Sequence, residues 1–146
     1  MIEIICNNET SLSCPNFIEI EKIAMVVFNE QNIKDGDISF IFSSDELLSN
    51  LKMEFFGENL LTDVIAFRLN DYLESTIEGE IYISLQRAKE NSKIYDQPYP
   101  KEIARLIIHG CLHLIGFNDK NNDEKTLMNK MENNFLNKVN WKDIFI

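Results

Sequence analysis

The sequence predicts an α+β fold, or a loosely regular α/β sheet, and three observations support this prediction. Segments with the apolar spacing of helices are mixed in uneven order with short segments rich in β-branched and aromatic residues. The chain has 146 residues, of which 45% are apolar, with only five Gly and three Pro, so it can bury a core. It contains neither an internal repeat nor a linker rich in Ser, Gly or Pro, so residues 1–146 are expected to form one domain.

The first half of the chain predicts two strands and two helices. Met1–Cys6 alternates weakly and is apolar enough for a strand, and Phe17–Phe28 carries apolar side chains at helical spacing. Ile38–Ser43 is short and rich in β-branched and aromatic residues, which favours a second strand. A Ser-Asp pair follows it and can cap a helix over Glu46–Phe56.

The second half predicts two more strands and three helices. The strands are Thr62–Leu69 and Glu80–Leu85, joined by the acidic loop Asn70–Gly79. The helices are Gln86–Lys93, Lys101–Ile115 and Asp123–Val139. The second of these helices follows a proline, which is favoured at a helix start, and is nearly all apolar from Leu106 onward, so it is expected to run through the core. Trp141 is expected to fix the last helix to the body.

Charge and cysteine usage limit the classes of function. The 14 Lys and Arg residues are outnumbered by 24 Asp and Glu, giving a net charge of -10, the wrong sign for a protein that coats a nucleic acid. Glu3 stands where a secretory signal would need basic residues, and no stretch approaches the roughly 20 apolar residues of a membrane span. The three cysteines have unrelated spacings, so reduced thiols and a cytoplasmic location are expected. Cys111 is expected to pack in the core rather than bind a metal.

The two histidines of the chain lie four residues apart in the predicted core helix. His109 and His113 are therefore one turn apart on the same face, where two imidazoles can share one metal ion. Gly116 and Asp119 complete the string HxxxHxxGxxD. In zinc hydrolases with HExxHxxGxxH, the glycine ends the helix and turns the chain so that a third ligand reaches the metal, and a carboxylate can serve as that ligand. The alternative is a hydrogen-bonded histidine pair without a metal.

The residue after the first histidine limits the reaction. Zinc peptidases of the HExxH type use the glutamate at this position as general base, and here the position holds Gly110. Peptide hydrolysis is therefore the least favoured activity. Beyond a water held by the metal, the sequence assigns no catalytic group.

These residues resemble a known family. His109–Asp119 (HGCLHLIGFND) is similar to the HGxLHLxGYDH signature of the YbeY family, metal-dependent endoribonucleases of ribosomal RNA maturation. Thr62–Phe67 (TDVIAF) resembles its TDVLSF segment, and Gly79–Ile81 with Ile83–Ser84 resembles its GDIxIS strand. The resemblance covers most of the chain. It implies an α+β fold in which helices surround a mixed four-stranded sheet.

The resemblance also implies a function. One Zn²⁺ per chain would be held by His109, His113 and Asp119. The activity would be single-strand-specific RNA cleavage, acting on the 3′ end of small-subunit ribosomal RNA and in ribosome quality control. The implied partners are ribosomal RNA, the small ribosomal subunit and its proteins, with no role for DNA or a membrane.

This chain departs from the family pattern at six positions. These are Phe56, Ala66, Glu80, Phe117, Asn118 and Asp119. Asp119 replaces a histidine and remains an acceptable zinc ligand. Phe56 stands where an arginine thought to serve RNA handling usually lies, and phenylalanine cannot make the bidentate phosphate contact of an arginine.

A basic segment before the motif offers a possible RNA approach. Residues 86–105 include five basic and three acidic side chains. The candidates for guiding a phosphate backbone are Arg87, Lys89, Lys93 and Arg105. An ordinary solvated helix face is an equal alternative. Tyr95, Tyr99 and Phe117 could stack bases but are expected to pack, and a phosphate role for Arg68 is not favoured.

The leading hypothesis has one competitor from a different class. A ribosome-assembly factor without enzymatic activity could keep the metal as a structural element and act through protein partners. The acidic composition and Phe56 suit this alternative.

Overall fold

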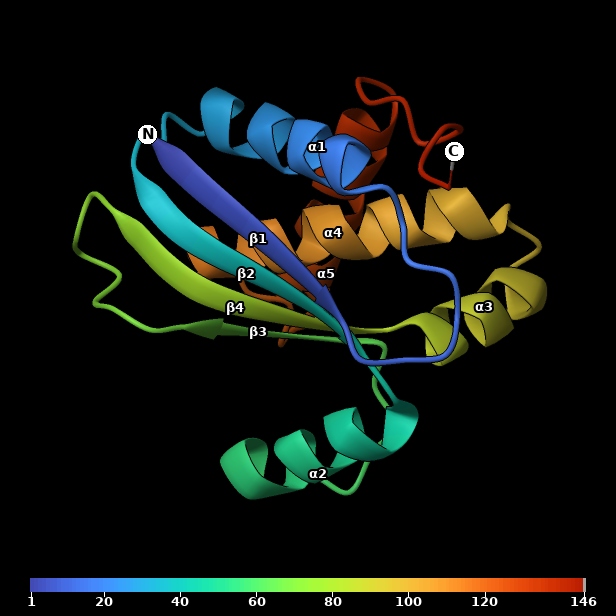
Figure 1. The fold of residues 1–146 in the computed structure, drawn as a ribbon. Helices are drawn as coiled ribbons and strands as arrows, with labels where there is room; N and C mark the ends of the chain where they lie inside the picture. The colour runs from blue at the N-terminus through green and yellow to red at the C-terminus, as the bar shows by residue number, and fades with distance from the viewer. Residues whose placement is uncertain (146) are drawn as a thin grey trace.

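A mixed sheet of four strands forms the centre of the fold in the computed structural model, which describes residues 1–145 (Figure 1). The strand order is β1-β2-β4-β3. β1 (Ile2–Asn8), β2 (Gly36–Ser43) and β4 (Ile77–Ser84) run parallel, and the edge strand β3 (Val64–Arg68) is antiparallel to β4. The predicted α+β fold with a mixed four-stranded sheet is confirmed.

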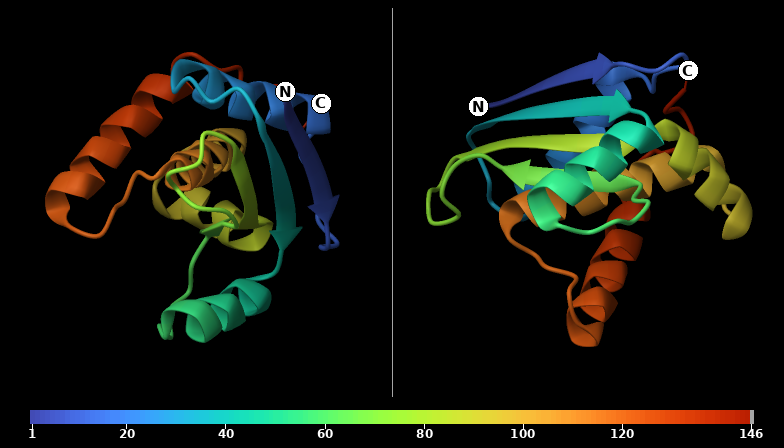
Figure 2. Two further views of the ribbon diagram at one scale, coloured as in Figure 1. Left: turned by 90° about the vertical axis from the view of Figure 1, so that its left-hand side faces the viewer. Right: turned by 90° about the horizontal axis from the view of Figure 1, so that it is seen from below.

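Five helices surround the sheet, and their bounds are α1 (Phe17–Glu30), α2 (Asp45–Phe56), α3 (Leu85–Ile94), α4 (Tyr99–Ile115) and α5 (Asn122–Leu136). α4 lies against β3 and β4 and contacts α1, α3 and α5, so it is the central helix. α2 contacts β3 and β4 and extends away from α1, α4 and α5 (Figures 1 and 2). Among residues 1–145, no helix is both long and apolar enough to cross a bilayer.

The central helix runs through the core, as its apolar sequence predicts. Leu106, Ile107 and Ile108 on α4 are buried, and Cys111 is fully buried as a packing residue. Gly110 lets this helix approach the sheet closely, because a Cβ at this position would lie 2.6 Å from Cγ2 of Ile81 on β4. The position that holds a general base in HExxH enzymes is thus the point where α4 contacts the sheet.

Several predicted boundaries shift in the structure. β4 begins at Ile77 instead of Glu80, because Ile77 is buried and pairs with Gly36 of the neighbouring strand. The loop before it is correspondingly shorter. Leu85, predicted as the end of that strand, begins α3 because the Ser84 hydroxyl accepts from the Arg87 amide at 3.0 Å and caps the helix.

The other differences lie at strand and helix ends. β1 ends two residues later than predicted, β2 begins two residues earlier, and β3 is shorter at both ends. α4 starts at Tyr99, with the proline in its first turn as predicted. α5 begins with a capping box between Asn121 and Glu124 and ends at Leu136, three residues before the predicted end. Trp141, beyond α5, packs against the core, as predicted.

Candidate metal centre

The histidines of α4 and the turn after it form a cluster of three metal-ligand types. His109 and His113 point the same way from successive turns, and their Nε2 atoms lie 3.0 Å apart. Gly116 ends the helix with a φ of 121°, a conformation that favours glycine, and the chain then reverses. The reversal brings Oδ2 of Asp119 to 3.4 Å from both Nε2 atoms.

The chemistry and spacing of this triad fit a divalent metal. All three ligand atoms lie within 4.8 Å of one another, and within residues 1–145 no other group of three such side chains does. Two imidazoles and one carboxylate match the ligand set of a catalytic zinc site, which uses three protein ligands and keeps a further position open. The three side chains are partly exposed, so the triad faces solvent on one side.

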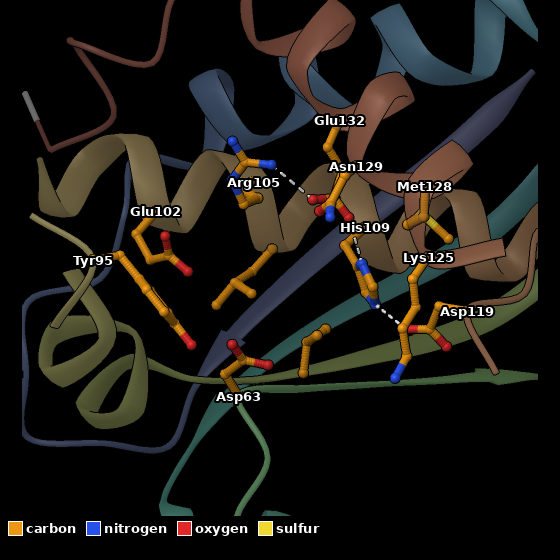
Figure 3. A pocket seen from close by; sticks show the side chains of 12 residues that line it. Asp63, Tyr95, Glu102, Arg105, His109, Asp119, Lys125, Met128, Asn129 and Glu132 are labelled. Atoms are coloured by element: carbon orange, nitrogen blue, oxygen red, sulfur yellow. Dashed lines mark hydrogen bonds and ion pairs between the residues drawn. The ribbon is translucent and has the colours of Figure 1, made fainter. Parts of the chain in front are cut away.

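A buried carboxylate from α5 contacts the first histidine. Oε2 of Glu132 lies 2.6 Å from Nδ1 of His109, and only 4% of Glu132 is exposed (Figure 3). Arg105 donates from Nη1 to the other Glu132 oxygen at 2.8 Å and from Nη2 to Oδ1 of Asn133 at 2.7 Å. A proton held on Nδ1 leaves Nε2 of His109 as the acceptor that faces the triad.

Sequence reasoning missed Glu132. The spacing of the apolar residues in this helix could have identified it, because position 132 falls on the buried face of α5 together with Met128 and Phe135. A glutamate on such a face requires a partner in the core.

The triad perturbs the pKa of each of its members. Burial alone would lower the pKa of His109, but hydrogen bonds with Asp119 and Glu132 raise it to about 9. Burial and the nearby charge of His109 lower the pKa of His113. The hydrogen bond from His109 lowers the pKa of Asp119 against the opposing effect of burial.

These pKa shifts predict that zinc affinity rises with pH. Ligand imidazoles bind a metal in the neutral form, so zinc must displace the proton that His109 holds at neutral pH. The apparent association constant should increase by up to about tenfold per pH unit below pH 9. Competition with a chromophoric chelator at pH 6.5, 7.5 and 8.5 measures this slope, after correction for the proton binding of the chelator. An affinity that is constant across this range would contradict it.

A groove of about 890 Å³ opens over the triad. It is lined by all three candidate ligands, by Phe56 from the end of α2 and by Tyr72 from the loop before β4. Its basic side chains are Lys52, Lys120 and Lys125. A second cavity, of about 450 Å³, lies on the other side of His109, and its charged lining is mainly acidic, with Arg105 and Lys125 as the basic members.

The basic residues expected to guide RNA are not gathered at this groove. Arg87 is bound to Asp45 of α2 at 2.8 Å, and Arg105 is bound to Glu132. Lys89 and Lys93 lie on the exposed face of α3 and line neither cavity next to the triad. The segment is basic in sequence, but its side chains point in different directions around two helices.

The remaining aromatic and basic candidates have mostly structural contacts. The Tyr99 ring stacks on Phe145, and Phe117 packs against the core, as expected. Tyr95 is exposed and lines the acidic cavity. Arg68 donates to the carbonyl oxygen of Leu114 at 2.8 Å and to others in the loop before β4, so it ties this loop to the end of α4.

Comparison with known proteins agrees with this geometry. A family model described as Endoribonuclease YbeY matches residues 5–140. The Endoribonuclease YbeY of Christiangramia forsetii is 41% identical over 97 residues, which cover 66% of this chain and 66% of that protein. The Endoribonuclease YbeY of Karelsulcia muelleri is 34% identical over 128 residues, which cover 88% of this chain and 89% of that protein.

A solved structure shows the same fold. The solution structure of a Thermotoga maritima protein aligns with a TM-score of 0.62 and 26% identity, covering 95% of this chain and 89% of that chain. The sequence signature, the fold and the relatives agree, and the chain therefore belongs to the YbeY endoribonuclease family.

Proposed function

We propose that this protein is a zinc-dependent endoribonuclease that cleaves single-stranded RNA during ribosome maturation in the cytoplasm. The observation that carries the proposal is the triad of His109, His113 and Asp119 at the base of an open groove, in a chain of an endoribonuclease family. The proposed substrate is the 3′ end of small-subunit ribosomal RNA, with a further role in ribosome quality control. Residues 1–146 would act as one domain.

In this proposal each group at the site has a separate task. The three side chains of the triad hold zinc, which supplies Lewis-acid polarisation of a phosphoryl oxygen when bound. Glu132 keeps a proton on Nδ1 of His109 and so fixes the direction of Nε2. Lys52, Lys120 and Lys125 line the groove, where they can contact backbone phosphates, Lys52 in exchange for its ion pair with Glu58 at 3.6 Å.

The test of this function uses the purified full chain with one equivalent of zinc. A labelled single-stranded oligoribonucleotide should be cut internally, and the same sequence in a perfect duplex should stay intact. Absence of cleavage with zinc, manganese and magnesium alike would contradict the proposal. For the ribosomal role, cells depleted of the protein should accumulate small-subunit RNA with extended 3′ ends, and normal 3′ ends in depleted cells would contradict that role.

Binding of free RNA is expected to be weak and sensitive to salt. Three lysines line the groove of a chain with a net charge of -10. Three phosphate contacts to a single strand give a log–log slope of about -2, so affinity should fall about 20-fold between 50 and 200 mM salt. Fluorescence anisotropy with an oligoribonucleotide measures this slope.

Two lysine variants show which surface RNA follows. Lys120→Gln should reduce the slope by about 0.7, because it removes one phosphate contact. Lys89→Gln, on the exposed face of α3, should leave it unchanged. If Lys89→Gln reduces the slope and Lys120→Gln does not, RNA approaches along the basic segment at 86–105 instead of the groove. Tight RNA binding that resists salt would contradict an approach along either surface.

An assembly factor without enzymatic activity remains the second candidate, and one surface favours it. Phe55 on α2 and Leu60 and Leu61 after it are 60%, 57% and 63% exposed, an apolar run that suits contact with a ribosomal protein. Under this alternative the metal is structural. A variant without metal would then still associate with the small subunit as long as it folds.

A further inference from the structure

The acidic cavity beside His109 has no task in the function proposed above. It lies between the end of α3, the first half of α4, the chain before β3 and α5 (Figure 3). Tyr95 forms one wall, and Leu106, Val64 and Met128 contribute apolar surface. The polar lining includes four carboxylates, from Asp63, Glu102, Asp119 and Glu132, and two basic side chains, Arg105 and Lys125.

Glu102 is the unusual member of this lining. Only 5% of it is exposed, yet its carboxylate has no hydrogen bond or ion pair with any residue within 1–145. Figure 3 shows the carboxylates of Glu102 and Asp63 directed into the space between Tyr95 and His109. By contrast, Glu132 is held by Arg105, and Asp63 accepts from Asn91 at 3.1 Å. The Glu102 oxygens are open to the cavity, because within residues 1–145 the one buried side-chain nitrogen or oxygen without a hydrogen-bond partner is Nε of Arg87, so they are free to accept from a ligand that brings hydrogen-bond donors.

The chemistry of the lining narrows the class of ligand. A phosphate is disfavoured because it would face four carboxylates and only two basic side chains, of which Arg105 is already paired with Glu132. A second metal ion is disfavoured because the acidic lining contains no group of three ligand atoms within 4.8 Å, apart from the triad itself. A neutral ring with N–H or O–H donors fits, because apolar walls and an exposed tyrosine can hold its faces while carboxylates accept from its edge.

We propose that this cavity is a nucleoside subsite, in which Glu102 accepts hydrogen bonds from the base or the ribose of the nucleotide next to the triad. The inference rests on the proposed RNA-cleaving function and adds a binding site to it. The two spaces meet at His109 and Asp119, which line both. The phosphate backbone therefore follows the lysines of the groove, and one nucleoside enters the acidic cavity. Guanine is the best match among the bases, because its adjacent N1–H and N2–H donors face two carboxylate oxygens.

The test measures binding of single nucleotides to the zinc-loaded full chain by NMR titration. The probes are guanosine 5′-monophosphate, inosine 5′-monophosphate, 2′-deoxyguanosine 5′-monophosphate and ribose 5-phosphate. Guanosine monophosphate should bind at least about 50-fold more tightly than ribose 5-phosphate, as expected for a charged hydrogen bond plus a stacked base. Glu102→Gln should remove this difference, and the control Glu90→Gln, an exposed glutamate of α3, should preserve it.

The other two probes separate the two sources of donors. A loss of affinity with inosine monophosphate assigns the contact to the base amino group, and a loss with the deoxynucleotide assigns it to the ribose hydroxyl. Full affinity for both would assign the contact to N1–H, which both probes retain. Equal binding of guanosine monophosphate and ribose 5-phosphate by the wild-type chain would overturn the proposal. The wild-type comparison holds even if Glu102→Gln fails to fold. A second zinc equivalent that disappears in Glu102→Gln would also overturn it, because the cavity would then be a metal site.

This experiment separates the inference from the function on which it rests. Binding does not require cleavage. If the protein cuts no RNA but binds nucleotides in a way that depends on Glu102, the proposed activity is contradicted and the proposed subsite is supported. If the protein cuts RNA but nucleotide binding does not change in Glu102→Gln, only the proposed subsite is contradicted.

Discussion

Replacing His113 with alanine is expected to abolish RNA cleavage and to weaken zinc binding by more than about 100-fold. The change removes one of three candidate ligands, whereas loss of a residue that only supports a ligand costs 10–100-fold. His113 is partly exposed at the base of the groove and does not belong to the buried core of α4, so the fold should persist. Metal content after dialysis and gel-based cleavage of a single-stranded oligoribonucleotide measure the two effects.

A matched control lies next to the triad. Asn118 lines the same groove but lies outside the ligand cluster, so Asn118→Ala should keep zinc and most of the activity. Circular dichroism melts of both variants after chelation of metal show whether the fold is retained. If His113→Ala binds zinc as the wild type does, the triad is not the metal site; if it loses zinc but still cuts RNA, the metal is structural.

The motif at 109–119 could be predicted because its geometry is local. Two histidines four residues apart share a helix face whatever surrounds them, and Gly116 marks the point where the chain can reverse. The structure confirms both features and places Asp119 beside the two imidazoles. Similarly, the apolar run in α4 was sufficient to identify the core helix.

The contacts between separate elements could not be read from the sequence. Arg105 was a candidate for RNA binding because it is basic and close to the motif, but α5 packs beside α4 and gives it Glu132 as a partner. The start of β4 depends in the same way on its pairing with β2, since Ile77 lies opposite Gly36. Residue type and local spacing do not specify which distant side chain will neutralise a charge or extend a strand.

The pair formed by Glu132 and His109 shows why such a contact matters for function. An imidazole can carry its proton on either nitrogen, and only one arrangement directs a free Nε2 to the triad. A carboxylate at 2.6 Å from Nδ1, fixed by Arg105 from its other side, selects that arrangement before any metal arrives. Glu132 is therefore a positioning residue for the proposed zinc site, and it acts through His109.

Glu132→Gln is expected to weaken zinc binding 10–100-fold while the fold is retained. The amide has nearly the shape of the carboxylate but only one oxygen, so when that oxygen accepts from Arg105 the NH2 group faces Nδ1 of His109 and cannot accept its proton. The change should also lower the pKa of His109, because the hydrogen bond with Glu132 is one of the causes that raise it to about 9. The lower pKa of His109 reduces the competition between protons and zinc at neutral pH. The loss of zinc affinity measured at neutral pH is therefore smaller than the full effect of the substitution.

The deficit caused by Glu132→Gln should consequently be larger at pH 8.5 than at pH 7, because proton competition at His109 fades as the pH approaches 9. Chelator competition at both pH values measures this difference in zinc affinity. Glu90→Gln, at an exposed position of α3, is the charge-matched control. The Nδ1 proton of His109 should give a downfield NMR signal in the wild type that shifts upfield in Glu132→Gln. A merely structural glutamate would alter the melting temperature but neither this signal nor the pH dependence of zinc affinity. Zinc affinity within twofold of the wild type at pH 8.5 would therefore exclude a positioning role, whatever happens to RNA cleavage.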